Sequence, residues 1–209
     1  WCVQLKTSDG TIARRVGPTV SDGLIYIVDV DEAPLVLALD AKTGKEVWRY
    51  SMGTEHGDNI IAPCVVSGYV IVGTKTTFKR GDEAPPVHGR VMALDAKSGK
   101  EIWSRTDIYP SQHMVSDGTL LIVKSNIEIG MKPNDNLKMR ALEVKTGKEL
   151  WSQPIKSVYA AETIMSDKIL QKHYGSPLIA FDRKDGRKLW ELSIPTGSGC
   201  GSPTISGNY

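Results

Sequence analysis

Residues Ala38 to Trp48 read A-L-D-A-K-T-G-K-E-V-W, and this stretch decides the fold. Three further copies follow it, A-L-D-A-K-S-G-K-E-I-W, A-L-E-V-K-T-G-K-E-L-W and A-F-D-R-K-D-G-R-K-L-W, which end at Trp103, Trp151 and Trp190. The offset from alanine to tryptophan is ten residues in every copy (48−38, 103−93, 151−141 and 190−180). The chain has five tryptophans; four close these copies, and the fifth is Trp1. Self-similarity of this kind is the sequence signature of a repeat architecture.

Each copy has the pattern of a β-hairpin. Its first half, around Leu39, has the apolar density of a buried strand, and its second half alternates, as a strand with one solvated face does. Between the halves, Asp40 can accept hydrogen bonds from the backbone two residues on, and Gly44 can adopt a positive φ without steric cost. A tryptophan buries about 150–250 Å² and needs a small neighbour. We therefore predict that each motif alanine faces its tryptophan.

A second pattern precedes each copy. Residues 17–28, G-P-T-V-S-D-G-L-I-Y-I-V, match residues 62–72 and 112–123, and match residues 163–170 more weakly. Ser-Asp-Gly within it is a turn signal. Each unit thus has four antiparallel strands in roughly 40–45 residues, which is the pattern of a propeller blade with almost no helix. We predict blades at about 16–50, 59–105, 111–153 and 161–192, with residues 193–209 beginning a further blade, and burial of Trp48, Trp103 and Trp151 between blades.

The repeat A-L-D-x-x-T-G-K-x-x-W resembles the tryptophan-docking repeat of the pyrroloquinoline-quinone (PQQ) β-propeller superfamily, and the resemblance extends over almost the whole chain. It implies an all-β fold, a β-propeller with four-stranded antiparallel blades. About four blades are present, as part of a ring of about seven or eight. The superfamily holds quinoprotein dehydrogenases and also non-enzymatic scaffolds such as the outer-membrane assembly lipoprotein. Function belongs to sites placed on a fold, so the resemblance alone does not choose between them.

Both ends of the sequence fall inside the repeat pattern. Trp1 has no preceding motif, and residues 201–207 begin a fifth upstream pattern. We expect an excerpt of a larger propeller, with remaining blades in a longer chain; a small four-bladed ring is the alternative. An incomplete ring leaves open strand edges, which pair with other chains. The segment alone is therefore expected to be marginal, to dimerise or to aggregate.

Composition argues against several classes of function. The net charge is +2 over 209 residues, which gives no basis for nucleic-acid or membrane-surface binding as the main role. No run of about eighteen apolar residues is present, so no membrane span is predicted. Cys2, Cys64 and Cys200 are an odd count, which does not indicate a disulfide framework. Cys64 lies in an apolar strand, and we interpret it as a small buried hydrophobe.

The expected meander places the irregular segments on one face of the blades. The Ser-Asp-Gly and Asp-x-x-Thr-Gly turns share one side, whereas the loops between second and third strands share the other side with the blade connections. We call the first side the turn face and the second the loop face. Ligands bind to loops that a rigid scaffold holds, so the candidate site residues are on the loop face: His56, Asp58, Asn59, His113, Tyr159, Glu162 and Cys200.

Each of the more reactive candidates has a functional and a structural interpretation. His56 with Asp58 suits a metal ligand set or an acid–base pair, or else a solvated polar loop. His113 either points into the central channel or hydrogen-bonds a neighbouring blade. Glu162 resembles, by position only, the acidic calcium ligand of quinoproteins; otherwise it lines a wet channel. The glycine-rich segment 197–201 lets backbone approach a ligand, but no Gly-Lys-Ser/Thr follows it, as a phosphate loop requires.

Two functions follow from the resemblance. The first is a non-catalytic propeller that binds a protein partner or a small ligand on its loop face, or acts as a scaffold there. The second is a segment of a quinoprotein alcohol or sugar dehydrogenase that uses PQQ with calcium. The PQQ alcohol dehydrogenases carry a vicinal cysteine pair near the cofactor, and no two cysteines here are adjacent. The first function is therefore preferred, with no firm cofactor, no assigned catalytic or metal-binding residue, and an extracytoplasmic location implied by the resemblance.

Overall fold

The computed structural model describes residues 17–29, 35–53, 59–75, 89–125, 137–155, 161–172 and 177–193, without the side chains of Asn59, Gln112, His113 and Ala161. Contacts divide the chain into two compact units. Unit 1 comprises Trp1–Pro110 with Ile127–Met131, and unit 2 comprises Ser111–Asn126 with Lys132–Tyr209. Every regular element in the described ranges is a β-strand, as the short β-branched segments predict. No helix in these ranges is long and apolar enough to cross a membrane.

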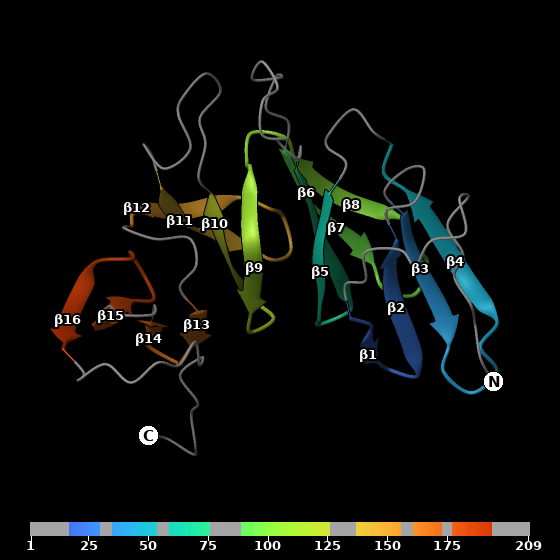
Figure 1. Cartoon of the computed structure of the whole chain (residues 1–209), viewed down its shortest axis with the longest axis horizontal. Helices are drawn as coiled ribbons and strands as arrows, with labels where there is room; N and C mark the ends of the chain where they lie inside the picture. Colours follow the sequence, from blue (N-terminus) through green and yellow to red (C-terminus); the bar gives the residue numbers. More distant parts are fainter. Residues whose placement is uncertain are drawn as a thin grey trace, which may run out of the picture. The chain divides into compact units, whose positions relative to one another are not determined.

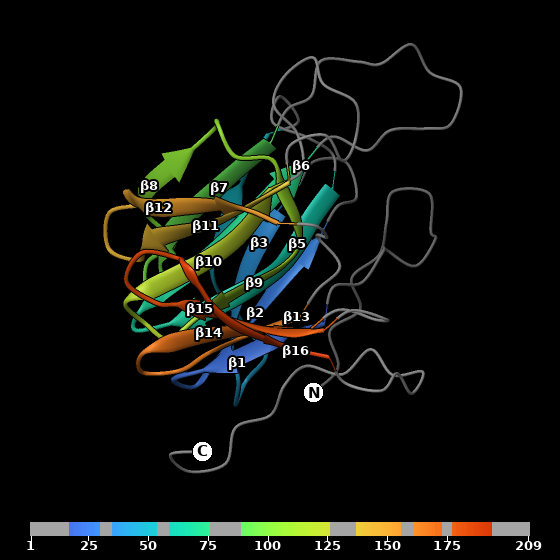
Figure 2. The same cartoon turned by 90° about the vertical axis from the view of Figure 1, so that its left-hand side faces the viewer.

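The described strands form four four-stranded sheets, each with its strands in chain order (Figures 1 and 2). We call each sheet a blade. Blade 1 contains β1 (Thr19–Ser21), β2 (Leu24–Asp29), β3 (Leu35–Asp40) and β4 (Glu46–Ser51); blade 2 contains β5 (Asn59–Val66), β6 (Tyr69–Lys75), β7 (Gly89–Asp95) and β8 (Glu101–Arg105). Blade 3 contains β9 (Pro110–Ser116), β10 (Leu120–Ser125), β11 (Lys138–Glu143) and β12 (Glu149–Pro154); blade 4 contains β13 (Ala161–Ile164), β14 (Lys168–Lys172), β15 (Leu178–Asp182) and β16 (Lys188–Leu192). All pairs are antiparallel.

The motif turn folds as the sequence predicts. The Asp40 carboxylate accepts hydrogen bonds from the backbone N–H groups of Lys42 and Thr43, and Gly44 has φ +70°. In each blade this second turn, between the third and fourth strands, is hydrogen-bonded to the first turn, between the first and second strands. The N–H of Ala41, for example, donates to the carbonyl of Gly23 at 2.9 Å. The two turns of a blade therefore share one face, as the meander requires.

The motif alanines and tryptophans are direct cross-strand partners, which agrees with the prediction that each alanine faces a tryptophan. The four pairs are Ala38 with Trp48, Ala93 with Trp103, Ala141 with Trp151 and Ala180 with Trp190. The strand pairing shifts by one residue directly after each alanine. The residue before the tryptophan is therefore left without a cross-strand partner, as in a β-bulge. The alanine and the tryptophan thus lie on the same face of their blade.

In unit 1, Trp48 of blade 1 docks on the second turn of blade 2. Its indole N–H donates to the carbonyl of Ala96 at 3.0 Å, and the Tyr26 hydroxyl donates to the same oxygen at 3.1 Å. A Cβ placed on Gly99 would lie 2.5 Å from the Trp48 ring, so only glycine allows this approach. Trp48 is 8 % exposed and belongs to a core that also contains Val28 and Ala96.

In unit 2, Trp151 of blade 3 docks on blade 4 in the same way. Its indole N–H donates to the carbonyl of Arg183 at 3.0 Å, and a Cβ on Gly186 would lie 2.5 Å from its ring. Trp151 is 9 % exposed, so burial is confirmed for Trp48 and Trp151. Trp103 is partly buried, so the prediction is met less completely there than at Trp48 and Trp151.

Candidate functional site

Most of the predicted loop-face candidates lie outside the described residues. His56, Asp58, Tyr159 and Cys200 belong to segments that the structure does not describe, and Asn59 and His113 lie on β5 and β9 without described side chains. The proposed packing of residues 201–206 beside blade 1 also lies outside the described ranges. Glu162 on β13 is the predicted candidate whose side chain can be followed, and we build the site from it.

Glu162 forms a buried ion pair with Lys124 of the preceding blade. The Lys124 ammonium lies 3.0 Å from Oε2 of Glu162, and the two side chains are 0 % and 1 % exposed. The side-chain amide of Gln171, on the neighbouring strand β14, donates to Oε1 at 2.9 Å. Both carboxylate oxygens are therefore engaged inside the protein. A calcium ligand or a channel-lining residue would present this carboxylate to an ion or to water, whereas here it is buried against the Lys124 ammonium.

The electrostatics of this pair are set by its burial. Removal of Lys124 from water lowers the pKa of its ammonium below the usual value, and the charge and hydrogen bond of Glu162 oppose that shift. A buried charge pair of this kind is expensive to desolvate and is costly to break, because the remaining partner is left uncompensated. Lys124 and Glu162 thus depend on each other for their charged forms.

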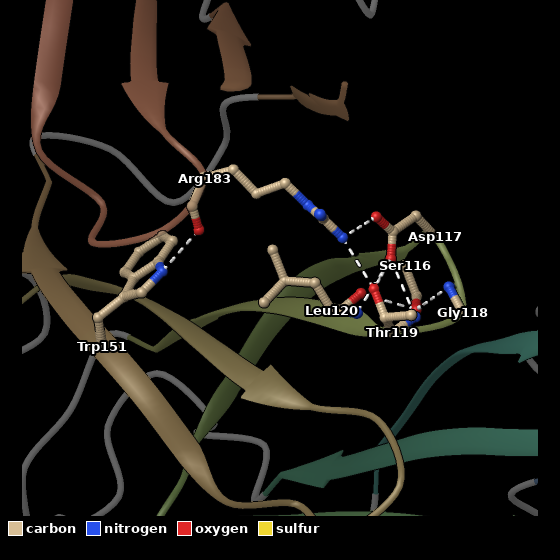
Figure 3. Close-up of polar contacts among 7 residues, drawn as sticks. All are labelled: Ser116, Asp117, Gly118, Thr119, Leu120, Trp151 and Arg183. Atoms are coloured by element: carbon tan, nitrogen blue, oxygen red, sulfur yellow. Dashed lines mark hydrogen bonds and ion pairs between the residues drawn. The ribbon is translucent and has the colours of Figure 1, made fainter. Parts of the chain in front are cut away.

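A second ion pair joins blades 3 and 4 at the turn face (Figure 3). The Arg183 guanidinium pairs with the Asp117 carboxylate and donates to the Thr119 hydroxyl at 2.8 Å. Figure 3 shows the Arg183 side chain extending towards the first turn of blade 3 while its backbone carbonyl receives the Trp151 indole. One residue of blade 4 therefore both accepts the docking tryptophan and pairs with a carboxylate of blade 3.

The turn that contains Asp117 positions its carboxylate for the contact with Arg183. Blade 3 has three residues, 117–119, between β9 and β10, whereas blade 1 has two between β1 and β2. The extra residue lets the Asp117 carboxylate accept hydrogen bonds from the N–H groups of Thr119 and Leu120. Burial raises the pKa of Asp117, but these hydrogen bonds and the charge of Arg183 outweigh it, so that the pKa lies below its usual value. The carboxylate is held ionised for Arg183.

An open groove of about 590 Å³ adjoins the second pair on the turn face of unit 2. Its lining residues are Thr119, Leu120, Glu143, Leu150, Ser166, Asp167, Asp182, Arg183 and Lys184. The lining mixes three carboxylates with two cations, and the Arg183 cation is paired with Asp117. This mixture favours no one class of charged ligand. Within the described ranges, no three His, Cys, Asp or Glu side chains are grouped as a metal site.

Sequence reasoning misses Lys124 and Arg183. The strand pattern puts Lys124 at the start of a variable insertion, and Arg183 looks like an ordinary turn residue of the fourth motif. Alignment of the repeats carries the signal: the position of Arg183 holds Ala41, Ala96 and Val144 in the other three blades. A charge at a position that is otherwise apolar marks Arg183, whereas the position of Lys124 holds Val28, Gly73 and Lys172 in the other blades and carries no such signal.

Comparison with known proteins gives one family and several partial relatives. The profile of the family described as outer membrane protein assembly factor BamB matches residues 1–167. Quinohemoprotein alcohol dehydrogenase ADH IIB of Pseudomonas putida is 33 % identical over 124 residues, 58 % of this chain and 17 % of that protein. Outer membrane protein assembly factor BamB of Escherichia coli (strain K12) is 28 % identical over 103 residues, 49 % of this chain and 24 % of that protein.

A solved structure supports the fold. The quinohemoprotein alcohol dehydrogenase of Comamonas testosteroni superposes with a TM-score of 0.63 at 19 % identity, over 92 % of this chain and 38 % of that one. At this identity the likeness concerns the fold alone. The sheets are thus blades of a β-propeller of the PQQ-like type, and the chain spans less than a quarter of the Pseudomonas putida and Escherichia coli relatives.

Proposed function

This chain belongs to the PQQ-like β-propeller family described as outer membrane protein assembly factor BamB, and from that membership we propose that it is part of a non-catalytic binding propeller. Its loop face binds a protein partner and holds it as a scaffold does. Further blades of a longer chain complete the ring, and the protein works outside the cytoplasm. The name of the Escherichia coli relative, outer membrane protein assembly factor BamB, supports both the scaffold role and the location.

The observation that carries this proposal is the internal use of Glu162. Its carboxylate is paired with Lys124 at 3.0 Å and accepts a hydrogen bond from Gln171, and both ion-paired side chains are buried. The polar groups of the motif turns are used in the same way; the Asp95 carboxylate, for example, accepts hydrogen bonds from the backbone and hydroxyl of Ser98. These carboxylates of the described residues therefore stabilise the scaffold, which favours recognition by loops.

The proposed binding residues are the remaining loop-face candidates. They are His56, Asp58, Asn59, His113, Tyr159 and Cys200. Their segments vary in length and composition between blades, whereas the turns of the opposite face repeat. Variable loops on a repeated scaffold are where binding residues gather.

Site-specific photo-crosslinking in cells that produce the full-length protein tests this proposal. A photoreactive amino acid in place of Ser157, two residues before the loop-face candidate Tyr159, samples the predicted loop face. One in place of Lys184, an exposed residue of the second turn of blade 4, samples the turn face as a matched control. We expect one discrete protein adduct from position 157 and none from position 184. Adducts from position 184 alone, or none from several loop-face positions, would contradict the proposal.

A second candidate function is a segment of a quinoprotein alcohol or sugar dehydrogenase. The 33 % identity to a quinohemoprotein alcohol dehydrogenase favours it, whereas the engaged carboxylate of Glu162 does not. PQQ would accept the hydride from the substrate, and its site would depend on blades beyond these. Titration of the purified full-length protein with PQQ and Ca²⁺ separates the two functions. Saturable PQQ binding with alcohol-dependent dye reduction would favour the dehydrogenase, and the absence of both would favour the binding propeller.

A further inference from the structure

Two positions beside the docking tryptophan are apolar in unit 1 and charged in unit 2. Lys124 of blade 3 corresponds to Val28 of blade 1. The motif alanine of each blade has a cross-strand partner, Ile122 in blade 3 and Tyr26 in blade 1, and Lys124 and Val28 each lie two residues after that partner. Arg183 of blade 4 takes the place of Ala96 in blade 2, because each supplies the carbonyl that receives the indole. Val28 and Ala96 are buried in the core of unit 1. The contact of unit 2 thus carries charge at two positions where the contact of unit 1 has hydrocarbon.

The two charges are paired reciprocally across the contact between blades 3 and 4. Blade 3 contributes the cation Lys124 and the anion Asp117, and blade 4 contributes the anion Glu162 and the cation Arg183. We call these four residues the charged seam. Lys124 and Glu162 lie on β10 and β13, whereas Asp117 and Arg183 lie in turns of the turn face. The seam therefore joins the two blades at two separate points. Blade 3 supplies the cation at one point and the anion at the other.

We propose that the charged seam is a recognition device that selects blade 4 as the docking partner of blade 3 during folding. The need for selection follows from the repeat, because all four motifs present an alanine, a tryptophan and a turn glycine at the same spacing. A tryptophan could therefore dock on the turn of a wrong blade. Misassembly of this kind is a known hazard of repeat proteins, and buried charge is one way to specify against it.

A wrong partner would not satisfy the seam. The inner strand of blade 2 carries Ile60, Ile61, Ala62 and Pro63 in the stretch that corresponds to Glu162, so Lys124 docked there would be buried without a counter-charge. Blade 1 likewise presents Val28 and not a cation to an incoming blade. A buried, unpaired charge is strongly unfavourable. Correct pairing is therefore distinguished from incorrect pairing by electrostatics, although the tryptophan contact is shared.

A cross-link between blades 3 and 4 measures the selection directly. The Gln153 side chain donates to the carbonyl of Asp185 at 3.2 Å, so a Q153C/D185C pair in the full-length protein accepts a short bis-maleimide when blade 4 docks on blade 3. The cross-linked share is measured by mass spectrometry after refolding. We expect K124E or E162K alone to lower this share about tenfold or more, on the scale of a broken buried pair, and the K124E/E162K double reversal to restore most of it.

A neutral variant separates selection from stability. In K124M/E162Q the buried charges are gone, and such replacements are often neutral or stabilising; the amide at position 162 also keeps a partner for Gln171. We expect this variant to fold but to give a reduced cross-linked share. The matched control is E46K/R49E, the reversal of an exposed pair within β4, which should leave the share unchanged. If the neutral variant refolds with the cross-linked share of the parent protein, or if the double reversal restores nothing, the proposal is wrong.

Discussion

The docking contact of unit 1 and the docking contact of unit 2 differ beside an identical tryptophan. Around Trp48 the neighbours are Val28, Tyr26 and Ala96, and the indole and the Tyr26 hydroxyl donate hydrogen bonds there. Further along the same contact, the Tyr50 hydroxyl donates to the Glu101 carboxylate of blade 2, so charge is present there but not at the two positions that flank the tryptophan. Around Trp151 the two equivalent flanking positions carry Lys124 and Arg183, both in ion pairs. The geometry of the tryptophan is the same in both units. One docking motif is thus compatible with two different balances of apolar burial and charge.

The difference shows which parts of the motif are architectural. The tryptophan, the alanine opposite it and the turn glycine set the approach of the two blades, because they leave no room for other residues. The flanking positions are free to vary, provided that any charge placed there is paired. Sequence changes at the flanks can therefore make one contact distinct from the next without altering the fold.

Removal of a docking tryptophan should have the largest effect in both units. Trp48→Ala and Trp151→Ala each delete a buried indole, and we expect each to cost about 3–5 kcal/mol of stability. Val47→Ala is the internal control; because Val47 directly precedes Trp48 and is 48 % exposed, its truncation should cost about 1 kcal/mol or less. Denaturant unfolding midpoints of the full-length variants provide the measurement. A midpoint for Trp151→Ala equal to that of the parent protein would mean that the contact in unit 2 relies on charge alone.

Substitution of the turn glycines should give the next largest losses of stability, and the loss should be greater where the glycine touches a docking tryptophan. Gly99→Ala and Gly186→Ala combine a positive φ with a Cβ placed 2.5 Å from an indole atom. Gly23→Ala is the matched control, since its φ is +77° and nothing lies within 4 Å of the added carbon. The control should lose about 1–2 kcal/mol through backbone conformation, and the other two roughly 1–3 kcal/mol more through overpacking. Equal losses for the three variants in denaturant unfolding would show that the turns tolerate a larger residue at the contact.

The hydroxyl of Tyr26 sharpens the comparison further. It donates a buried hydrogen bond to the carbonyl that also receives the Trp48 indole, whereas the equivalent residue in blade 3 is Ile122. Tyr26→Phe should cost about 0.5–1.5 kcal/mol. The decisive test is the double variant with Ala at position 48, in which the hydroxyl should matter less than in the parent. If the losses of stability of the two single variants simply add in the double variant, the hydroxyl of Tyr26 does not contribute to the docking contact.

Acid should weaken the contact in unit 2 through Asp117. Because its folded pKa lies below the usual value, its stabilising effect is complete above the unfolded pKa of about 3.9 and is lost as the pH falls through the folded pKa. The effect should be small, about 1 kcal/mol or less, since the pair with Arg183 is partly exposed and exposed pairs contribute little. Unfolding measured from about pH 6 to about pH 2.5 should show a shallower acid limb for Asp117→Asn. An identical limb would contradict the assignment.

Repetition made the fold predictable from sequence. The ten-residue offset from Ala38 to Trp48, repeated four times, specified hairpin, turn and cross-strand partner, and the structure has each of these. Local patterns succeed here because turn chemistry and strand alternation act over a few residues. The degree of burial of each tryptophan is harder to predict, because it depends on a neighbouring blade that the local pattern does not contain.

The site was less predictable, for a physical reason. Glu162 was identified by its position on the loop face, but its partner Lys124 lies on another strand 38 residues earlier (162−124). Arg183 was hidden in the same manner, because its carboxylate partner, Asp117, lies in the turn of the preceding blade. Which two charges meet is decided by the docking of whole blades, and a single sequence does not show that docking until the repeats are aligned in register.

Hydrogen exchange of the full-length protein, with and without Glu162→Gln, tests the central comparison most directly. This substitution removes the carboxylate that pairs with the buried ammonium of Lys124, so its cost should fall on the contact of unit 2 alone. We predict faster amide exchange in β9, β10 and the strands of blade 4, with the exchange of β1 to β7 unchanged. Equal acceleration in both units, or no acceleration in blade 4, would contradict the account in which the buried Lys124–Glu162 pair stabilises the contact of unit 2 alone.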